Sequence, residues 1–398
     1  MIEERTLEPP TLEAQILSPD AGSTRLRRAY GFEEVALVPG AVTVDPAEVE
    51  LVTQVGGLRL EIPFIAAAMD AVADADFAVR MAGHGGLAFV NLEGLYTRYD
   101  DAAPIIERVA AAPNGQAAGA ILAEAYEAPV RDELISALIM RIKAQGAIAA
   151  VSTTPGAAWH HAEVAAEAGA DLFLVQSQVS SARHISTAGR VLSLADLTGA
   201  LKLPVLVGNT VSGEAAYQLM HQGAAALLVG VGPGAACTTR EVLGIGVPQV
   251  SATLEVAAAR DRYQAETGRY VPVITDGGMK TGGDIAKAIA SGADAVMLGS
   301  PFAAALEAPG RGFNWGMAAP SPTLPRGTRI RIGERLPLEQ ILFGPAHTSH
   351  GTQNLVGALR QSMAALGARN IREMHSVEMV IAPAIATEGK SWQLAGQE

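Results

Sequence analysis

A single cysteine, Cys237, lies in a glycine-rich segment, VGVGPGAACTT, that follows a short apolar run. Gly230, Gly232 and Gly234 allow the backbone to turn sharply and to approach a ligand closely. The apolar run is the sixth of eight predicted strands, so in a parallel barrel the loop lies on the catalytic, carboxyl-end face. The helix-like stretch TTREVL follows, and a helix N-terminus favours the nucleophilic thiolate. A lone cysteine is more often an inert buried residue, but these neighbours favour a nucleophile.

Two further strand ends carry residues that suit a nucleotide. Asp276-Gly277-Gly278 follows the seventh predicted strand, and Gly299-Ser300 follows the eighth. In barrels the loops after these two strands commonly form a phosphate site. Glycine N–H groups and the Ser300 hydroxyl would hold the phosphate, and Asp276 would accept hydrogen bonds from ribose hydroxyls. Asp-Gly-Gly alone is a weak signal, but together with Gly-Ser at the next strand end it favours a mononucleotide site.

The histidines are less informative than the cysteine loop. His160-His161 starts a predicted helix with no carboxylate at metal-ligand spacing, so a solvated face is expected. His347 and His350 flank a loop, and a role in proton transfer is the minor interpretation for them. No cysteine–histidine cluster predicts a zinc site.

The elements that must position these residues are eight short apolar runs, each followed by a stretch of helix length. Continuous apolar strands separated by helices predict an α/β fold, a closed (β/α)8 TIM barrel. Helical patterns at 157–168, 212–222 and 281–291 are followed by Gly-Ala pairs typical of helix C-caps. An open doubly wound sheet is the alternative, but eight units and no GxGxxG after the first strand disfavour it. The runs begin at Pro63, Gly86, Ala147, Asp171, Pro204, Ala225, Pro272 and Asp294.

One catalytic domain spanning residues 1–398 is predicted, with two segments outside the barrel rhythm. Residues 92–146 are too long for one crossover and predict a short helical insertion after the second strand. Its two expected helices, near 100–111 and 130–144, are joined by a turn at Pro113-Asn114-Gly115. Residues 311–354 are rich in glycine and proline, and they predict a mobile flap and loop over the barrel mouth.

Composition limits the possible functions. The chain of 398 residues is 49% hydrophobic, which is ample for a large core, and its formal net charge of −12 disfavours a nucleic-acid partner. One cysteine excludes an intramolecular disulfide. The first residues lack the apolar region of a secretory signal, and no run of 18 apolar residues predicts a membrane span. A soluble, cytoplasmic protein is therefore expected.

The cysteine loop and its surroundings resemble the IMP dehydrogenase/GMP reductase family. The resemblance rests on GPGAACTTREVLGIGVPQ, on VPVITDGGMKTGGDIAKAIASGADAVMLGS, and on EAPG, GFEEVALVPG and IPFIAAAMDAV. It covers nearly the whole chain and is closest to the dehydrogenase-related branch that lacks regulatory CBS domains. Full-length dehydrogenases carry those domains where residues 92–146 lie here. The resemblance also implies a homotetramer.

The resemblance implies NAD-dependent oxidation of IMP to XMP, a step of guanine nucleotide biosynthesis. Cys237 would attack C2 of the purine, hydride would pass to NAD, and water would hydrolyse the covalent thioimidate. Thr239 would help to position that water, and a monovalent cation, usually potassium, would bind to backbone carbonyls. The implied substrate contacts are Met69, Asn209, Asp276, Gly278, Gly299, Ser300, Gly316 and Met317; the cofactor contacts are Gln176, Gly230 and Gly232; the cation ligands are Gly232, Gly234 and Cys237.

Four positions near the implied ligands depart from the family pattern. Ala67 and Ala235 stand where the family often has serine, so hydroxyl contacts to the nucleotide are lost. Gln176 replaces the aspartate that meets the cofactor ribose, and Leu228 stands where an arginine lies beside the cofactor. These changes predict weaker nucleotide contacts and an altered cofactor position.

The flap departs from both branches of the family. It has no Arg-Tyr pair of the kind that activates water in the dehydrogenases, and no acid after Gly316-Met317 of the kind that the reductases use. Arg326 and Arg329, in LPRGTRI, are the candidates for activating water.

Three functions follow from these observations. The leading prediction is an IMP dehydrogenase. The second is a GMP reductase or a related purine-nucleotide oxidoreductase, and the third is a non-catalytic purine-nucleotide-binding regulator. The intact cysteine loop argues against the regulator, because binding alone does not require an activated thiol.

Overall fold

The computed structural model describes residues 27–185, 192–316 and 329–382. Within them, eight parallel strands close into a barrel in which β11 pairs with β4. Every predicted apolar run forms one of these strands, so the predicted (β/α)8 TIM barrel is confirmed and the open sheet is wrong. The strands are β4 (Phe64–Ala66), β5 (Leu87–Asn91), β6 (Ala150–Thr153), β7 (Leu172–Gln176), β8 (Val205–Thr210), β9 (Ala226–Val229), β10 (Val273–Asp276) and β11 (Ala295–Leu298).

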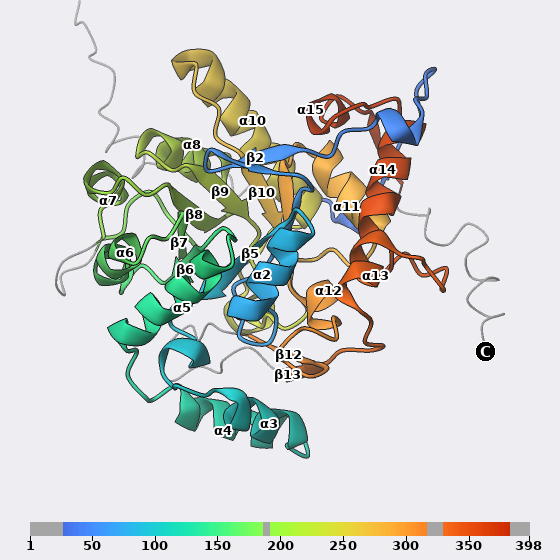
Figure 1. Cartoon of the computed structure of the whole chain (residues 1–398). Coiled ribbons are helices and arrows are strands. Elements are labelled where there is room, and N and C mark those ends of the chain that lie inside the picture. Colours follow the sequence, from blue (N-terminus) through green and yellow to red (C-terminus); the bar gives the residue numbers. More distant parts are fainter. Residues whose placement is uncertain (1–26, 186–191, 317–328, 383–398) are drawn as a thin grey trace, which may run out of the picture.

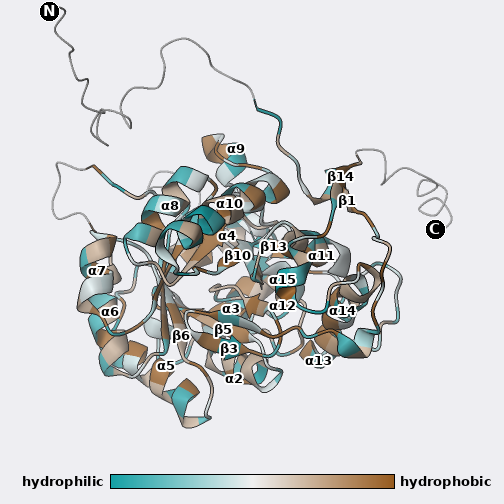
Figure 2. Ribbon diagram, turned by 90° about the horizontal axis from the view of Figure 1, so that it is seen from above, coloured by the Kyte–Doolittle hydropathy of each residue, from teal (hydrophilic) through white to brown (hydrophobic). Residues whose placement is uncertain are grey.

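Helices surround the barrel and carry both hydrophilic and hydrophobic residues, as expected for elements between solvent and a sheet (Figure 2). Gly169, Gly223 and Gly292, which follow α6, α8 and α11, have φ angles of 86°, 97° and 101°. These left-handed values confirm the predicted glycine C-caps. The helices around the strands are α2 (Ala75–Gly83), α5 (Asp132–Ala144), α6 (Ala158–Glu167), α7 (Leu194–Ala200), α8 (Gly213–His221), α10 (Gln249–Thr267), α11 (Gly282–Ala290) and α14 (Leu355–Ala365).

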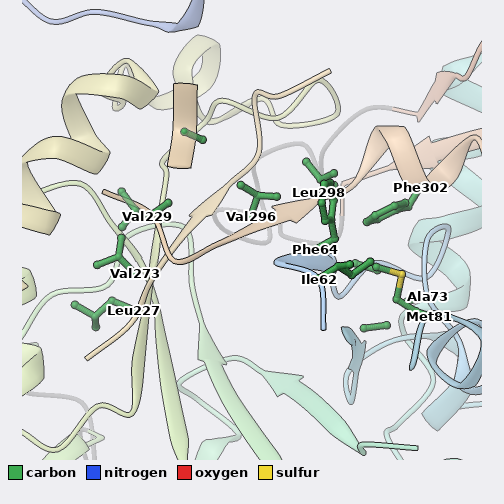
Figure 3. Close-up of a cluster of buried hydrophobic side chains, with 14 of the residues drawn as sticks. Ile62, Phe64, Ala73, Met81, Leu227, Val229, Val273, Val296, Leu298 and Phe302 are labelled. Atoms are coloured by element: carbon green, nitrogen blue, oxygen red, sulfur yellow. The ribbon is translucent and has the colours of Figure 1, made fainter. Parts of the chain in front are cut away.

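Alternate residues of the strands enter two separate apolar cores. Ile65, Phe89 and Leu174 belong to the core inside the barrel, together with residues of the hairpin formed by β2 (Thr53–Val55) and β3 (Leu58–Leu60). Their strand neighbours face outward and pack against the helices. Figure 3 shows part of this outward set, including Phe64, Leu298 and Met81 of α2. The two-residue alternation of each strand therefore fills both cores.

The insertion after β5 contains one helix more than predicted. It comprises η3 (Leu95–Thr97), α3 (Ala103–Ala111) and α4 (Gly115–Ala125), and α5 then returns the chain to the barrel. The predicted turn at 113–115 contains the N-cap of α4, because the Asn114 side chain accepts a hydrogen bond from Ala117 N at 2.9 Å. The sequence of α4, GQAAGAILAEA, is dominated by small residues, so its apolar face was not evident from periodicity.

The described ends of the predicted flap have regular structure. β12 (Phe313–Trp315) pairs antiparallel with β13 (Arg329–Arg331), and α13 (Leu338–Phe343) follows. Residues 317–328 lie outside the described residues, so the mobility of the flap stays a prediction. In Figure 1 the β2 strand lies at one end of the barrel. The strands β12 and β13 and the helices α3 and α4 lie at the opposite end.

Short elements also lie near the two ends of the described chain. β1 (Val35–Leu37) pairs with β14 (Met379–Ile381), and η1 (Phe32–Glu34) precedes β1. The remaining elements are η2 (Pro46–Glu48), α9 (Thr239–Leu243), α12 (Ser300–Ala303) and α15 (Ile371–Met374). Among the described residues, no helix has the length and apolar character needed to cross a membrane.

Candidate active site

A cavity of about 1060 Å³ lies at the carboxyl ends of the barrel strands. This is the end at which barrel enzymes carry their active sites, and the volume is slightly above the usual range for small-molecule sites. Met317 and Arg326 lie outside the described residues. The sequence-predicted residues that line the cavity are Met69, Gln176, Asn209, Gly230, Gly232, Gly234, Cys237, Thr239, Asp276, Gly278, Gly299, Ser300 and Gly316.

Cys237 is exposed in this cavity, two residues before α9 and next to its N-cap Thr238. Its Sγ lies 3.2 Å from Oγ1 of Thr239, the buried first residue of α9. The backbone N–H of Cys237 donates to the carbonyl of Gly234 at 3.0 Å, which closes a tight turn. The predicted nucleophile and its hydroxyl neighbour are therefore in direct contact.

Arg240 holds the cysteine loop in shape. Its guanidinium donates to the carbonyl of Val231 at 3.3 Å and to that of Val247 at 2.9 Å. Gly232 has a φ of 74°, and a Cβ there would lie 2.6 Å from Cγ of Arg240. Glycine is thus required at 232 both for backbone conformation and for space.

A carboxylate–amide network joins the ends of three strands. Oδ2 of Asp276, on β10, accepts hydrogen bonds from Nδ2 of Asn209 at 2.7 Å and from Nε2 of Gln176 at 3.2 Å. Nε2 of Gln176 also lies 2.9 Å from Oδ1 of Asn209. Burial raises the pKa of Asp276 to about 6, and the hydrogen bond from Asn209 opposes this shift. A carboxylate has room for about four hydrogen bonds, so Asp276 retains capacity for ribose hydroxyls.

Gln249 fixes this network to the cysteine loop, and the sequence prediction missed it. Its buried side-chain Nε2 donates to the carbonyl of Val229 at 2.7 Å and to that of Asp276 at 3.0 Å. The cysteine loop begins directly after Val229. Gln249 therefore holds the ends of β9 and β10, and with them Cys237 and Asp276, in a fixed relation.

Glycines and two polar side chains form the predicted phosphate end of the cavity. Gly277 and Gly278 have φ angles of 80° and 83°. Nδ2 of Asn314 donates to Oγ of Ser300 at 3.3 Å, and Asn314 is 1% exposed. Its Oδ1 is buried without a hydrogen-bond partner among the described residues. Asn314 also lines the cavity and was missed, although it stands two residues before Gly316.

A second carboxylate lies on the opposite wall. Glu93 follows β5 and accepts hydrogen bonds from Thr154 N at 2.6 Å, Thr154 Oγ1 at 3.1 Å and Thr153 Oγ1 at 3.1 Å. All three residues line the cavity. The sequence prediction missed Glu93, although its position just after a barrel strand was a usable signal. Three donors hold this carboxylate as a fixed group at the ends of β5 and β6.

The two adjacent histidines have different environments. Nε2 of His160 lies 2.8 Å from Oδ1 of Asp132 on the exposed surface, as expected for a solvated face. His161 is buried instead, and its Nδ1 lies 2.7 Å from Oγ1 of Thr153. Burial lowers the pKa of His161, which favours the neutral imidazole. The expectation of a solvated face was wrong for His161.

Arg329 does not reach the cavity. Its guanidinium donates to the carbonyls of Val109 at 2.6 Å and Ala112 at 3.2 Å, at the carboxyl end of α3. Its charged end also lies 4.3 Å from the centre of the Phe313 ring. In this arrangement the guanidinium lies away from Cys237. The structure therefore gives no support to the role of Arg329 in activating water, which stays a prediction.

Other sequence predictions are also placed by the structure. Leu228 is buried in the core inside the barrel and does not line the cavity, so this position does not meet a ligand. His347 and His350 are exposed and outside the cavity lining. Among the described residues, no group of three or more histidine, cysteine, aspartate or glutamate side chains could hold a metal ion.

Comparisons with known proteins agree with this site. Residues 29–317 match the IMP dehydrogenase/GMP reductase domain. A Mycolicibacterium smegmatis protein named "uncharacterized oxidoreductase" is 40% identical over 363 residues, 89% of this chain and 97% of that protein. Inosine-5′-monophosphate dehydrogenase of Methanocaldococcus jannaschii is 28% identical, over 87% of this chain and 91% of that enzyme. The crystal structure of an IMP dehydrogenase/GMP reductase-like protein from Corynebacterium glutamicum superposes with a TM-score of 0.84 at 34% identity, covering 91% of this chain and 96% of that one.

Proposed function

Since the chain belongs to the IMP dehydrogenase/GMP reductase family, we propose that it is an oxidoreductase that converts IMP to XMP with NAD as the hydride acceptor. The observation that carries this proposal is the juxtaposition within one cavity of Cys237, in contact with Thr239, and of Asp276 and Ser300. The first pair suits covalent chemistry on a purine. The second pair suits the ribose and the phosphate of a mononucleotide.

The proposed reaction begins with addition of the Cys237 thiolate to C2 of the purine. The hydrogen at C2 then leaves with its electron pair as hydride, and NAD⁺, when bound, supplies the acceptor. The sulfur remains bonded to C2 in a thioimidate. Water adds to C2, the carbon–sulfur bond breaks, and the thiol is regenerated as XMP leaves. The balance is IMP, NAD⁺ and water giving XMP, NADH and a proton, with covalent catalysis dividing one difficult step into two.

The water step relies on fewer groups than the hydride step. Thr239 Oγ1 lies 3.2 Å from the sulfur, so its hydroxyl is within reach of a water that attacks the adjacent carbon. The Arg-Tyr pair of the family flap is absent from the sequence, and Arg329 is occupied at α3. We therefore propose that hydrolysis limits turnover.

The wall opposite Cys237 supports NAD rather than NADP as the second substrate. We propose that a dinucleotide that reaches the purine at Cys237 extends toward Glu93, Thr153 and Thr154, which line the cavity on the side opposite β9. The Glu93 carboxylate can accept hydrogen bonds from ribose hydroxyls, as the corresponding aspartates of many dinucleotide sites do. The same charge would repel the additional phosphate of NADP.

The cysteine loop is compatible with a bound monovalent cation. The carbonyls of Gly232, Gly234 and Cys237 are the proposed ligands. The Gly234 carbonyl already accepts from Cys237 N at 3.0 Å, but a carbonyl oxygen has a second lone pair available. A cation bound there would hold the loop that carries Cys237.

Reduction of GMP is the alternative reaction within the same family, and it would use the same nucleotide end of the cavity. One spectrophotometric comparison separates the two reactions. NADH formation from IMP and NAD is the expected result. Oxidation of NADPH with GMP, without NADH formation from IMP, would reject the dehydrogenase in favour of the reductase. Binding of both nucleotides without either reaction would favour the non-catalytic regulator. Light scattering tests the homotetramer that the family relation leads us to propose.

A further inference from the structure

The insertion after β5 has its own apolar core, and this core encloses a residue of the β12–β13 hairpin. Val109 of α3 and Leu122 of α4 belong to a cluster that also contains Trp315 of β12 and Ala71 beyond β4. Trp315 has no exposed surface. In Figure 1, α3 and α4 lie at the same end of the barrel as β12 and β13. The insertion is therefore packed against two segments that border the active-site cavity.

A polar connection passes through this apolar core. The hydroxyl of Tyr126, which follows α4, donates to Oδ2 of Asp70 at 2.7 Å. Nε1 of Trp315 donates to the same hydroxyl at 3.3 Å. Asp70 Oδ2 also accepts from the backbone N–H of Leu95, in η3, at 2.7 Å. Tyr126 thus bridges β12 and the segment after β4.

Asp70 is fixed closely against the start of the insertion. It is 1% exposed, and its backbone carbonyl accepts from the Tyr96 hydroxyl at 2.9 Å. A Cβ at Gly94 would lie only 2.0 Å from Oδ1 of Asp70. Because Asp70 is held this closely, a displacement of the insertion would also displace the residues next to Asp70 in the chain.

We propose that Tyr126 is a positioning residue that sets the separation of the two walls of the purine subsite. Met69 directly precedes Asp70, and Gly316 directly follows Trp315. Both Met69 and Gly316 line the cavity, as does Tyr126 itself. The proposal rests on the proposed function only in taking a purine to lie between Met69 and Gly316. It gives the insertion a role in nucleotide binding at a place where full-length dehydrogenases carry separate domains.

The test compares two tyrosines of the same insertion. Tyr126→Phe removes the bridging hydroxyl, and Tyr99→Phe removes a hydroxyl that donates to the Ala125 carbonyl at 2.9 Å without lining the cavity. Tyr126→Phe loses two hydrogen bonds and Tyr99→Phe loses one, so both melting temperatures should fall, and that of Tyr126→Phe should fall further. Only Tyr126→Phe should weaken IMP binding measured by calorimetry, on the order of tenfold. An IMP affinity of Tyr126→Phe within twofold of wild type, or equal to that of Tyr99→Phe, would overturn the proposal.

A second measurement separates positioning from general loss of structure. Trp315→Phe removes the indole N–H that donates to the Tyr126 hydroxyl. If the two residues act through this one bond, the double variant should have the same IMP affinity as whichever single variant binds IMP less tightly. Additive losses would contradict a shared role. Trp315→Phe alone also decides the question if Tyr126→Phe fails to fold, because retained IMP affinity in that variant would reject the bridge. If the wild type binds IMP without forming NADH, the proposed function is rejected. The role of Tyr126 can still be tested, because the measurement is IMP affinity and not turnover.

Discussion

Nδ2 of Asn209 lies 2.7 Å from Oδ2 of Asp276, so an amide on β8 donates across the barrel mouth to a carboxylate on β10. β9, the strand that leads into the cysteine loop, lies between them in the barrel. The network that we propose for the ribose therefore surrounds the base of the loop that carries Cys237. This arrangement makes the protonation state of Asp276 important for both stability and nucleotide binding.

We predict that Asp276→Asn stabilises the ligand-free protein above pH 6. Burial raises the pKa of Asp276 from 3.8 to about 6, so the folded state retains a proton that the unfolded chain has released between these values. Stability of the wild type should fall as pH rises from about 4 to about 6, and the deficit should persist at higher pH. Asparagine removes this deficit, which amounts to at most about 3 kcal/mol.

Thermal denaturation at pH 4 and pH 8 tests this prediction. The two proteins should melt at similar temperatures at pH 4 and separate at pH 8. Asp196→Asn, a change at an exposed aspartate of α7, is the matched control and should alter stability by less than about 0.5 kcal/mol. A lower melting temperature for Asp276→Asn at pH 8 would show that burial is not the dominant effect. IMP affinity of the variant should nevertheless fall roughly ten- to a hundredfold, because a charged acceptor is lost.

The sequence predicted the barrel and most of the polar residues that line the cavity, because those signals are local. Apolar runs such as VPVIT specify a buried strand, Asp276 ends that strand, and Gly277 and Gly278 directly follow it. The barrel topology then brings all the strand ends to one face. Gln249 and Glu93 also occupy strand-end or loop positions, but their roles depend on which backbone groups they reach, and periodicity does not contain that information.

The insertion and the flap could not be predicted to the same extent, because long-range contacts determine them. Arg329 is separated by more than two hundred residues from the α3 carbonyls that it binds. Charge and position in a flap-like segment favoured a catalytic role, whereas the packing of α3 against the hairpin places this guanidinium on the α3 carbonyls. Tyr126 gave no sequence signal, since its contact with Asp70 exists only once the insertion has folded back onto β4.

We predict that Cys237→Ala abolishes NADH formation and leaves nucleotide binding largely unchanged. The thiol is exposed and packs against no core, so its removal creates no buried cavity. IMP affinity, measured by calorimetry, should stay within a few-fold of wild type because Asp276 and Ser300 are intact. Turnover of Cys237→Ala within a few-fold of wild type would exclude the cysteine as nucleophile.

We predict that Glu93→Gln shifts the preference between the two dinucleotides. Glutamine keeps the length of the side chain and can accept from Thr153 or Thr154, but it removes the negative charge. The ratio of kcat/KM for NADP to that for NAD should rise about tenfold, since a repulsion of roughly 1–2 kcal/mol is relieved. Glu61→Gln, at an exposed glutamate before β4, should leave the ratio unchanged. An unaltered ratio in Glu93→Gln would mean that the dinucleotide does not pass this wall.

The final prediction is a burst of NADH, equal in amount to the enzyme, before the steady state. Hydride transfer would use residues that share one cavity, since Cys237 contacts Thr239 and the residues proposed to bind the nucleotide, Asp276 and Ser300, line the same cavity. Hydrolysis lacks the Arg-Tyr pair of the family, and Arg329 is bonded to α3, which leaves Arg326 as the flap arginine that we propose for orienting water. Arg326→Ala should therefore slow the steady state about tenfold or more and preserve the burst. Arg331→Ala, at an exposed arginine of β13, is the matched control and should change neither phase. Stopped-flow absorbance measures both phases in one experiment, and a linear trace from the first turnover would place the slow step at or before hydride transfer.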